Sequence, residues 1–160
     1  MEQRPLTPSD EKEIVSFVHT LPRPHHWELF ATITFRRRRG LFEASKAYHR
    51  WMDCTVPRVT HFWAVERNPS GDGGHHVHAL WAGTEDLVRT EIWKKAFDQL
   101  GRARIEPIKS NEDVTMYCTK YAVKEGALIS WKLNKGCDYQ RFLQVPSRFV
   151  LPSPTARAQL

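Results

Sequence analysis

Apolar residues along the chain follow two spacings, one typical of α-helices and the other typical of β-strands. Apolar positions three and four residues apart predict helices over residues 9–21, 41–53, 85–100 and 111–125. Runs rich in β-branched and aromatic residues predict strands over 28–35, 59–66, 75–82, 102–108 and 138–144. A segment rich in glycine, residues 68–74, separates the second strand from the third and predicts a hairpin.

The order of these elements indicates the fold class. After the first helix the chain runs strand, helix, strand, strand, helix, strand, helix, strand. This arrangement predicts an α+β fold, a ferredoxin/RRM-like antiparallel sheet with helices packed on one face. We expect residues 28–145 to form this domain, residues 1–27 to form an N-terminal helical extension, and residues 146–160 to form a loose C-terminal tail.

The ends of two helices carry their own signals. Ser9 or Asp10 is placed to cap the first helix, and Ser110 is placed to cap the last one. Asp113 then occupies the capping-box position, and Gly126 is a plausible stop for the same helix.

Composition narrows the class of protein. The chain has 160 residues, the length of one domain, and a formal net charge of +6, which suggests an anionic partner such as nucleic acid. No apolar run approaches the roughly 18 residues that a membrane span needs, and no apolar stretch follows the N-terminus as in a signal peptide. Cys54, Cys118 and Cys137 form no Cys-x-x-Cys pair, which favours a reducing compartment and argues against structural zinc.

His76-Val77-His78 is the first group of residues that is a candidate for a chemical function. Because side chains alternate along a strand, the two histidines share one face and can chelate one divalent metal ion. Glu66 lies across the turn and completes a triad if the strand register sets it opposite His76 or His78. The alternative is a solvated sheet face that carries histidines by chance.

The segment Tyr117-Cys-Thr-Lys120-Tyr121-Ala-Val-Lys124 is the second group. At helical spacing, Tyr117, Lys120, Tyr121 and Lys124 share one face, with phenols one turn apart and ammonium groups beside them. A tyrosine is a usable nucleophile if its oxyanion is stabilised, and a nearby lysine favours the phenolate. The alternative is an amphipathic helix whose tyrosines cover the edge of the core.

Arginines make up the third group. Arg36, Arg37, Arg38 and Arg39 are consecutive, and Arg50, Arg58, Arg67, Arg102 and Arg104 add to the positive charge. Such side chains neutralise backbone phosphates without reading the base sequence. Aromatic residues such as Trp27, Phe35 and Trp63 are candidates for stacking on unpaired bases. The alternative for the arginine run is an exposed, solubilising turn.

The order of these motifs resembles that of the HUH endonucleases. Phe30-Ala-Thr-Ile-Thr-Phe35 resembles their first motif, and Glu66 with His76-Val77-His78 resembles their metal-binding second motif. Tyr-x-x-Lys-Tyr-x-x-Lys over 117–124 is similar to the third motif of rolling-circle replication initiators (Rep proteins) with two tyrosines. The tyrosines follow the histidine motif, as in Rep proteins, whereas relaxases have the reverse order.

This resemblance implies a specific activity and a specific set of site residues. It implies that His76, His78 and Glu66 bind Mn²⁺ or Mg²⁺ at a phosphate of single-stranded DNA. Tyr121 would attack first to give a 5′-phosphotyrosine and a free 3′-hydroxyl, and Tyr117 would attack second. Lys120 and Lys124 would assist at the phosphate or the phenol, and Arg36 to Arg39 would contact DNA.

The resemblance also implies partners and a location. The substrate would be a replication origin, which can include a hairpin, in the cytoplasm of the host cell of a plasmid or virus. No Gly-x-x-x-x-Gly-Lys-Ser/Thr loop is present in the sequence, so we expect a helicase to come from another chain. Three alternatives stay open: a single-strand transposase of the same superfamily, a degenerate relative, and a non-catalytic RRM-like nucleic-acid binder.

Overall fold

The computed structural model describes residues 6–124, 127–134 and 141–144. Its elements, in chain order, are α1 Pro8–Thr20, β1 Leu29–Phe35, α2 Leu41–Thr55, β2 Thr60–Arg67, β3 His75–Ala82, α3 Arg89–Gln99, β4 Gly101–Pro107, α4 Asn111–Tyr117, the π-helix η1 Cys118–Ala122, β5 Leu128–Lys132 and β6 Arg141–Gln144. Within these ranges, no helix is both long and apolar enough to cross a membrane.

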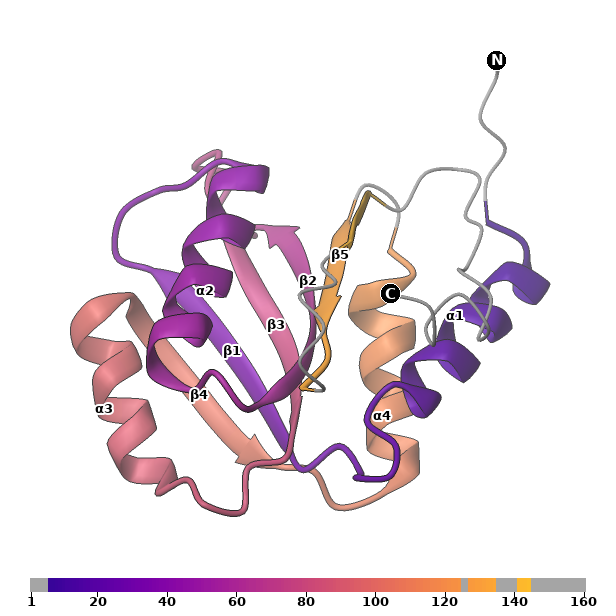
Figure 1. Ribbon diagram of the computed structural model, residues 1–160. Helices are drawn as coiled ribbons and strands as arrows, with labels where there is room; N and C mark the ends of the chain where they lie inside the picture. Colours follow the sequence, from indigo (N-terminus) through magenta and orange to yellow (C-terminus); the bar gives the residue numbers. More distant parts are fainter. Residues whose placement is uncertain (1–5, 125–126, 135–140, 145–160) are drawn as a thin grey trace.

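One antiparallel sheet organises the molecule. Its six strands lie in the order β4-β1-β3-β2-β5-β6, and every neighbouring pair is antiparallel (Figure 1). The first four strands in this order have the arrangement of a ferredoxin-like sheet, and β5 and β6 extend it at one edge. The predicted α+β fold with an antiparallel sheet is therefore confirmed.

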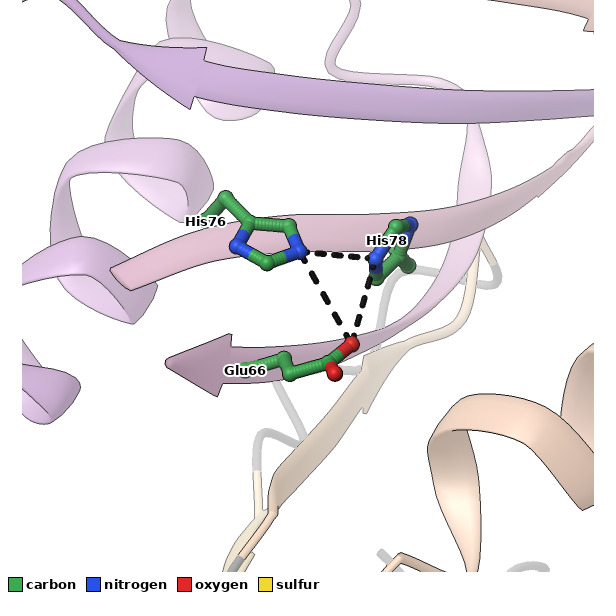
Figure 2. Close-up of side chains that lie close together, drawn as sticks. All are labelled: Glu66, His76 and His78. Carbon is green, nitrogen blue, oxygen red and sulfur yellow. Dashed lines mark hydrogen bonds and ion pairs between the residues drawn. The ribbon is translucent and has the colours of Figure 1, made fainter. Parts of the chain in front are cut away.

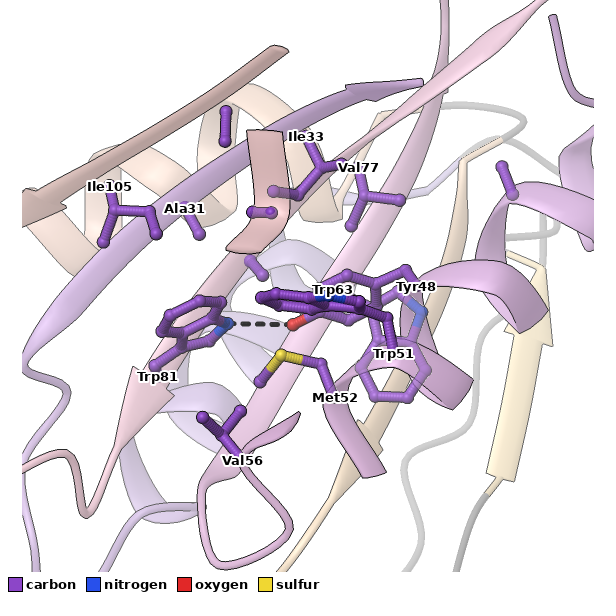
Figure 3. Close-up of a cluster of buried hydrophobic side chains, with 14 of the residues drawn as sticks. Ala31, Ile33, Tyr48, Trp51, Met52, Val56, Trp63, Val77, Trp81 and Ile105 are labelled. Carbon is purple, nitrogen blue, oxygen red and sulfur yellow. Dashed lines mark hydrogen bonds between the residues drawn. The ribbon is translucent and has the colours of Figure 1, made fainter. Parts of the chain in front are cut away.

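Helices α2 and α3 cover one face of this sheet. Alternate strand residues, among them Ile33, Trp63, Val77 and Trp81, point toward them and form a buried core (Figure 3). Polar atoms inside this core are paired, as buried polar groups must be. The Trp81 indole donates to the Tyr48 hydroxyl at 2.9 Å, and the Trp63 indole donates to the Ser45 hydroxyl at 2.9 Å.

The opposite face is covered as well, by α1 and α4, which corrects the expectation of helices on one face only (Figure 1). Ile14 and Val18 of α1 and Val114 of α4 share a second core with strand residues such as Phe62. The N-terminal helix, expected as an extension of the domain, is thus part of its packing. This second layer matters for function because it lies on the face that carries His76 and His78.

One strand and the start of one helix differ from the predictions, and local sequence explains both differences. Strand β5 is absent from the predictions, because its five residues, Leu-Ile-Ser-Trp-Lys, include only one β-branched and one aromatic residue to mark a strand. The cap of α1 is Thr7, in a capping box with Asp10, so the helix begins earlier than expected. Ser110 caps α4 as predicted, at 3.3 Å from the Asp113 amide.

Some predicted boundaries fall partly or wholly outside the described residues. Helical structure after Asn111 ends with the π-helix at Ala122, before the predicted end of that helix at residue 125. The strand expected over 138–144 is described only from Arg141 to Gln144. The stop expected at Gly126 and the tail over 146–160 lie outside the described residues.

Candidate metal and nucleophile site

The hairpin of β2 and β3 brings three ligand side chains together. Its register pairs Glu66 with His76, which is the condition under which the sequence predicts a triad. Nε2 of His76 lies 3.7 Å from Oε2 of Glu66, Nε2 of His78 lies 3.4 Å from the same oxygen, and the two Nε2 atoms are 2.9 Å apart (Figure 2). We call Glu66, His76 and His78 the triad.

Two polar side chains fix the orientation of the imidazole rings. Oδ1 of Asn68 lies 2.9 Å from Nδ1 of His76, and because an amide oxygen only accepts, that Nδ1 carries the proton. Nε2 of His76 then has a free lone pair in the neutral ring. Oγ1 of Thr32 lies 3.2 Å from Nδ1 of His78 and holds the second ring. Such outer contacts orient the ligands in metal sites.

Sequence reasoning assigned no role to Thr32 or Asn68. Thr32 was visible as the centre of the first motif, and Asn68 was visible as the start of the glycine-rich turn. Neither position reveals its partner, because each contact depends on how β1 and the turn meet β3 in space.

Burial keeps both imidazoles neutral. It lowers the pKa of His78 to about 3, with the charges of His76, Lys120 and Lys124 adding to the effect. Burial also lowers the pKa of His76, although the nearby Glu66 carboxylate opposes this shift. Neutral imidazole is the form that binds metal ions, so the site needs no deprotonation before a cation enters.

The triad fits a divalent cation. Its three donor atoms converge within the span that one ion bridges, and two imidazoles with one carboxylate form a facial set that leaves other coordination positions open. A second His-carboxylate group, His25 with Glu28 and Glu85, is also described. There, Glu28 already accepts hydrogen bonds from the amides of Gly83 and Thr84, at 2.9 Å and 3.1 Å, so it is less suited to a metal.

Helix α4 and the π-helix η1 place Tyr121 against the triad. The ring of Tyr121 stacks on the ring of His78, with centroids 3.6 Å apart and an angle of 18° between the planes. Tyr121 lies inside η1, whose i to i+5 bond runs from the Val123 amide to the Cys118 carbonyl at 3.1 Å. Such π-turns inside helices are frequent at functional sites.

Tyr117 lies in a different environment from Tyr121. It is 4% exposed, and its hydroxyl donates to the backbone carbonyl of His78 at 2.7 Å. Burial raises the pKa of the Tyr117 phenol well above its usual value. The structure therefore gives Tyr117 a place in the packing between α4 and β3, and it brings Tyr121 to the histidines.

The two lysines of this segment contact different parts of the site. Nζ of Lys120 lies 5.3 Å from the centroid of the Tyr121 ring. Nζ of Lys124 forms an ion pair and hydrogen bond with Oε1 of Glu66. The helical stripe predicted from the sequence is therefore split: Tyr121, Lys120 and Lys124 gather at the triad, and Tyr117 faces the core.

Most of the consecutive arginines hold the fold together. The guanidinium of Arg36 donates to the carbonyls of Phe97 and Asp98 at 2.6 Å and 3.3 Å, at the end of α3. Arg38 donates to the Asp72 carbonyl at 2.8 Å, and Arg39 pairs with Glu43 at 3.1 Å. Among the described residues, Arg37 alone in this run has no hydrogen bond or ion pair.

The aromatic residues considered for base stacking are core residues. Trp27, Phe35 and Trp63 are 6%, 8% and 0% exposed, so none of them offers a ring face to a base. Two exposed aromatic residues, Trp93 and Phe97, lie on α3, which covers the face opposite the triad.

Comparisons with known proteins add no relative. No model of a known protein family matches the chain, and neither a curated protein sequence nor a solved structure shows detectable similarity to it.

Proposed function

We propose that this protein is a replication initiator of the HUH type, which nicks and joins single-stranded DNA through a covalent bond to Tyr121. The observation that carries the proposal is the stacking of Tyr121 on His78, within a triad suited to a divalent cation. Three segments meet here, residues 30–35 through Thr32, residues 66–78 and residues 117–124. They are far apart in the sequence, and they carry the three motifs of the resemblance. A tyrosine beside a metal site provides a nucleophile and the charge stabilisation that phosphoryl transfer from DNA can use.

In the proposed reaction, the triad and Tyr121 have separate roles. A divalent cation held by the triad would polarise the scissile phosphate and offset charge on its oxygens. The phenolic oxygen of Tyr121 forms a bond to phosphorus while the bond from phosphorus to the 3′-oxygen breaks. The phenolic proton passes to the departing 3′-oxygen, so the products are a 5′-phosphotyrosine and a 3′-hydroxyl. The reverse step rejoins the strand without ATP, because the covalent link keeps the bond energy.

The lysines supply positive charge close to the reacting atoms. Lys120, whose Nζ lies 5.3 Å from the centroid of the Tyr121 ring, supplies positive charge that offsets negative charge on a phosphate bound at this tyrosine. Lys124 is positioned by Glu66 at the border of the triad, where a phosphate oxygen would approach. The positive net charge of the chain favours its association with the DNA strand.

A single-strand transposase of the same superfamily is the second candidate, and the burial of Tyr117 favours it. Enzymes with one nucleophile need only Tyr121, whereas a two-tyrosine initiator needs the Tyr117 hydroxyl to leave its bond to the His78 carbonyl. A joining assay with two oligonucleotides separates the candidates. A Tyr117→Phe variant that nicks but cannot join would support two nucleophiles, and one that does both would support a single nucleophile.

The non-catalytic RRM-like alternative is disfavoured by packing. Such domains bind RNA on an open sheet face that presents aromatic residues. Here α1 and α4 cover the face that carries the triad, and α2 and α3 cover the other. No stacked pair of exposed aromatic residues lies on a sheet face in the described part of the chain.

A covalent-adduct assay tests the proposed activity. The protein is incubated with Mn²⁺ and a labelled pool of single-stranded oligonucleotides whose central segment is randomised, and the products are run on a denaturing gel. We expect a slow band that disappears with chelator and with Tyr121→Phe, and persists with Tyr117→Phe. An adduct of undiminished yield in Tyr121→Phe would refute the assignment of the nucleophile.

Thermal unfolding with and without Mn²⁺ tests the metal site independently of DNA. A cation that binds only the folded state raises the melting temperature. We expect this rise in the unmodified protein and its loss in His76→Ala. His25→Ala, which alters the other His-carboxylate group, serves as the matched control and should keep the rise. The reverse pattern would place the metal at His25 and not at the triad.

A further inference from the structure

A cavity opens directly beside the triad. It measures about 510 Å³ and lies between the β4 edge of the sheet and the helical segment α4–η1. Phe30 and Leu80 line it from the sheet, and Tyr121 and Met116 line it from the helical side. The proposed catalytic tyrosine is therefore a wall of this cavity as well as the neighbour of His78.

The size and lining of the cavity suit an unpaired nucleobase. Ligand cavities typically measure roughly 300–1,000 Å³ and are mostly apolar with a few polar groups. The rings of Phe30 and Tyr121 are near parallel, at 18°, with centroids 6.1 Å apart. Unpaired bases of single-stranded DNA bind by stacking on such rings. Lys109 and Lys120 also line the cavity and supply positive charge for the backbone of the same strand.

We propose that this cavity binds one unpaired base of the DNA strand, adjoining the phosphate at the triad, and that Glu106 selects a base with an exocyclic amino group. This inference rests on the proposed function, because it assumes that a DNA phosphate lies at the triad. It goes further by assigning a base-binding site and a preference for cytosine, adenine or guanine over thymine.

The chemistry of Glu106 determines the preference. Glu106 lines the cavity, and its Oε1 forms an ion pair with the guanidinium of Arg104 at 2.8 Å. Among the described residues, no hydrogen bond reaches Oε2. A carboxylate only accepts hydrogen bonds, so it pairs with the amino group of cytosine, adenine or guanine and repels the O4 carbonyl of thymine.

The strand register places positive side chains where the DNA backbone would run from the triad to this cavity. Thr34 pairs with His76 on one side and with Arg102 on the other, and Thr32 pairs in the same way with His78 and Arg104. Directly paired residues project from the same face of a sheet. Arg102 and Arg104, both exposed, therefore lie at the β4 edge of the face that carries the triad, where they can neutralise phosphates that flank the bound base.

Methyl NMR of the methionines tests the cavity directly. Met116 is 69% exposed at the cavity, whereas Met52 is 1% exposed in the core on the other face of the sheet and serves as an internal control. The protein, labelled at its methionine methyl groups, is titrated with oligodeoxycytidylate or oligothymidylate in the presence of chelator, so that no cleavage occurs. Anisotropy of labelled oligonucleotide measures binding in parallel.

We expect oligodeoxycytidylate to shift the Met116 resonance through the ring current of the bound base, and to leave the Met52 resonance unchanged. Oligothymidylate should bind about tenfold more weakly, since one hydrogen bond to a charged group is lost. DNA binding without a Met116 shift would overturn the cavity assignment. A Met116 shift in a protein that forms no covalent adduct with Mn²⁺ present would leave the base site standing and refute the proposed function instead.

Substitution of Glu106 tests the selectivity. In Glu106→Gln the amide can also donate to a carbonyl, so the roughly tenfold preference for oligodeoxycytidylate should largely disappear while the Met116 shift remains. Glu91→Gln, which removes a charge from α3 on the opposite face, is the matched control and should keep the preference. An unchanged preference in Glu106→Gln would refute the role of this carboxylate.

Discussion

At the scale of single residues, environment separates side chains that the sequence presents as equivalent. Tyr117 and Tyr121 stand in the same repeated Tyr-x-x-Lys pattern, yet one is bound to the His78 carbonyl in the core and the other lies on the His78 ring. Burial raises the pKa of the Tyr117 phenol, which makes its anion costly to form. Burial has the same effect on the thiol of Cys118, which lies between the two tyrosines in the sequence.

Cys118 is expected to be inert toward alkylation, although it lies near the proposed nucleophile. It is fully buried, and burial raises the pKa of its thiol to about 12, so at pH 8 only about one thiol in ten thousand is ionised. Cys54 is exposed and is the matched control. Iodoacetamide treatment followed by peptide mass mapping should find Cys54 modified and Cys118 modified only after unfolding. Equal labelling of the two in the folded protein would contradict the burial of Cys118.

At the scale of elements, helix and strand ends are held by side chains from distant segments. Glu28, just before β1, accepts hydrogen bonds from the Gly83 and Thr84 amides after β3, and Arg36, just after β1, donates to carbonyls at the end of α3. The run of arginines thus contains side chains with different tasks. Arg36 neutralises the carbonyl end of a helix, where a cation is favourable, and Arg37 is left for solvent or for DNA.

The pair Arg36 and Arg37 allows a matched comparison. Arg36→Ala should lower the free energy of unfolding by about 1 kcal/mol, because two carbonyl contacts at the end of α3 are lost. Arg37→Ala should change it by less than about 0.5 kcal/mol, as is usual for an exposed residue without partners. Urea unfolding measures both variants. Stability losses of equal size would show that Arg36 does not anchor α3.

At the scale of the whole molecule, the sheet buries histidines on both faces. His61 lies in the core under α2, where burial lowers its pKa well below 6.5, with His49 and Lys132 adding to the shift. His78 lies under η1 on the other face, with its pKa lowered to about 3. In the unfolded chain both rings bind protons below pH 6.5, and in the folded protein they do not.

Stability should therefore fall as the pH drops below about 6.5, and it should not depend on these groups above that pH. The unfolded state binds more protons in this window, so the slope from each of the two histidines rises toward a limit of about 1.4 kcal/mol per pH unit as the pH falls below 6.5. Urea unfolding between pH 7 and pH 5.5 measures the slope. His61→Gln should reduce it, because it removes a ring that is neutral in the folded protein and protonated in the unfolded chain. A free energy of unfolding that stays constant over this range would contradict the lowered pKa values.

The α+β fold could be predicted from the sequence, because the residue patterns that mark most of its strands and helices lie within short segments. Runs of β-branched and aromatic residues marked β1 to β4, the glycine-rich turn marked the hairpin, and strand geometry alone set His76 and His78 on one face. Strand β5 escaped prediction, because it is only five residues long and carries one β-branched and one aromatic residue, Ile129 and Trp131, too few to mark a strand. The pairing of Glu66 with His76 depended on a register that the turn permitted but did not specify.

What the sequence determined by itself was most of the elements and the residue types that meet at the candidate site, because both follow from residue patterns and from chemistry within a few positions. Only the tertiary structure decided which tyrosine lies against the histidines, which arginines are engaged in packing, and that helices cover both faces. Those outcomes depend on neighbours from distant segments, such as the His78 carbonyl beside Tyr117 and the end of α3 beside Arg36. Burial is a property of these contacts, and no local pattern encodes it.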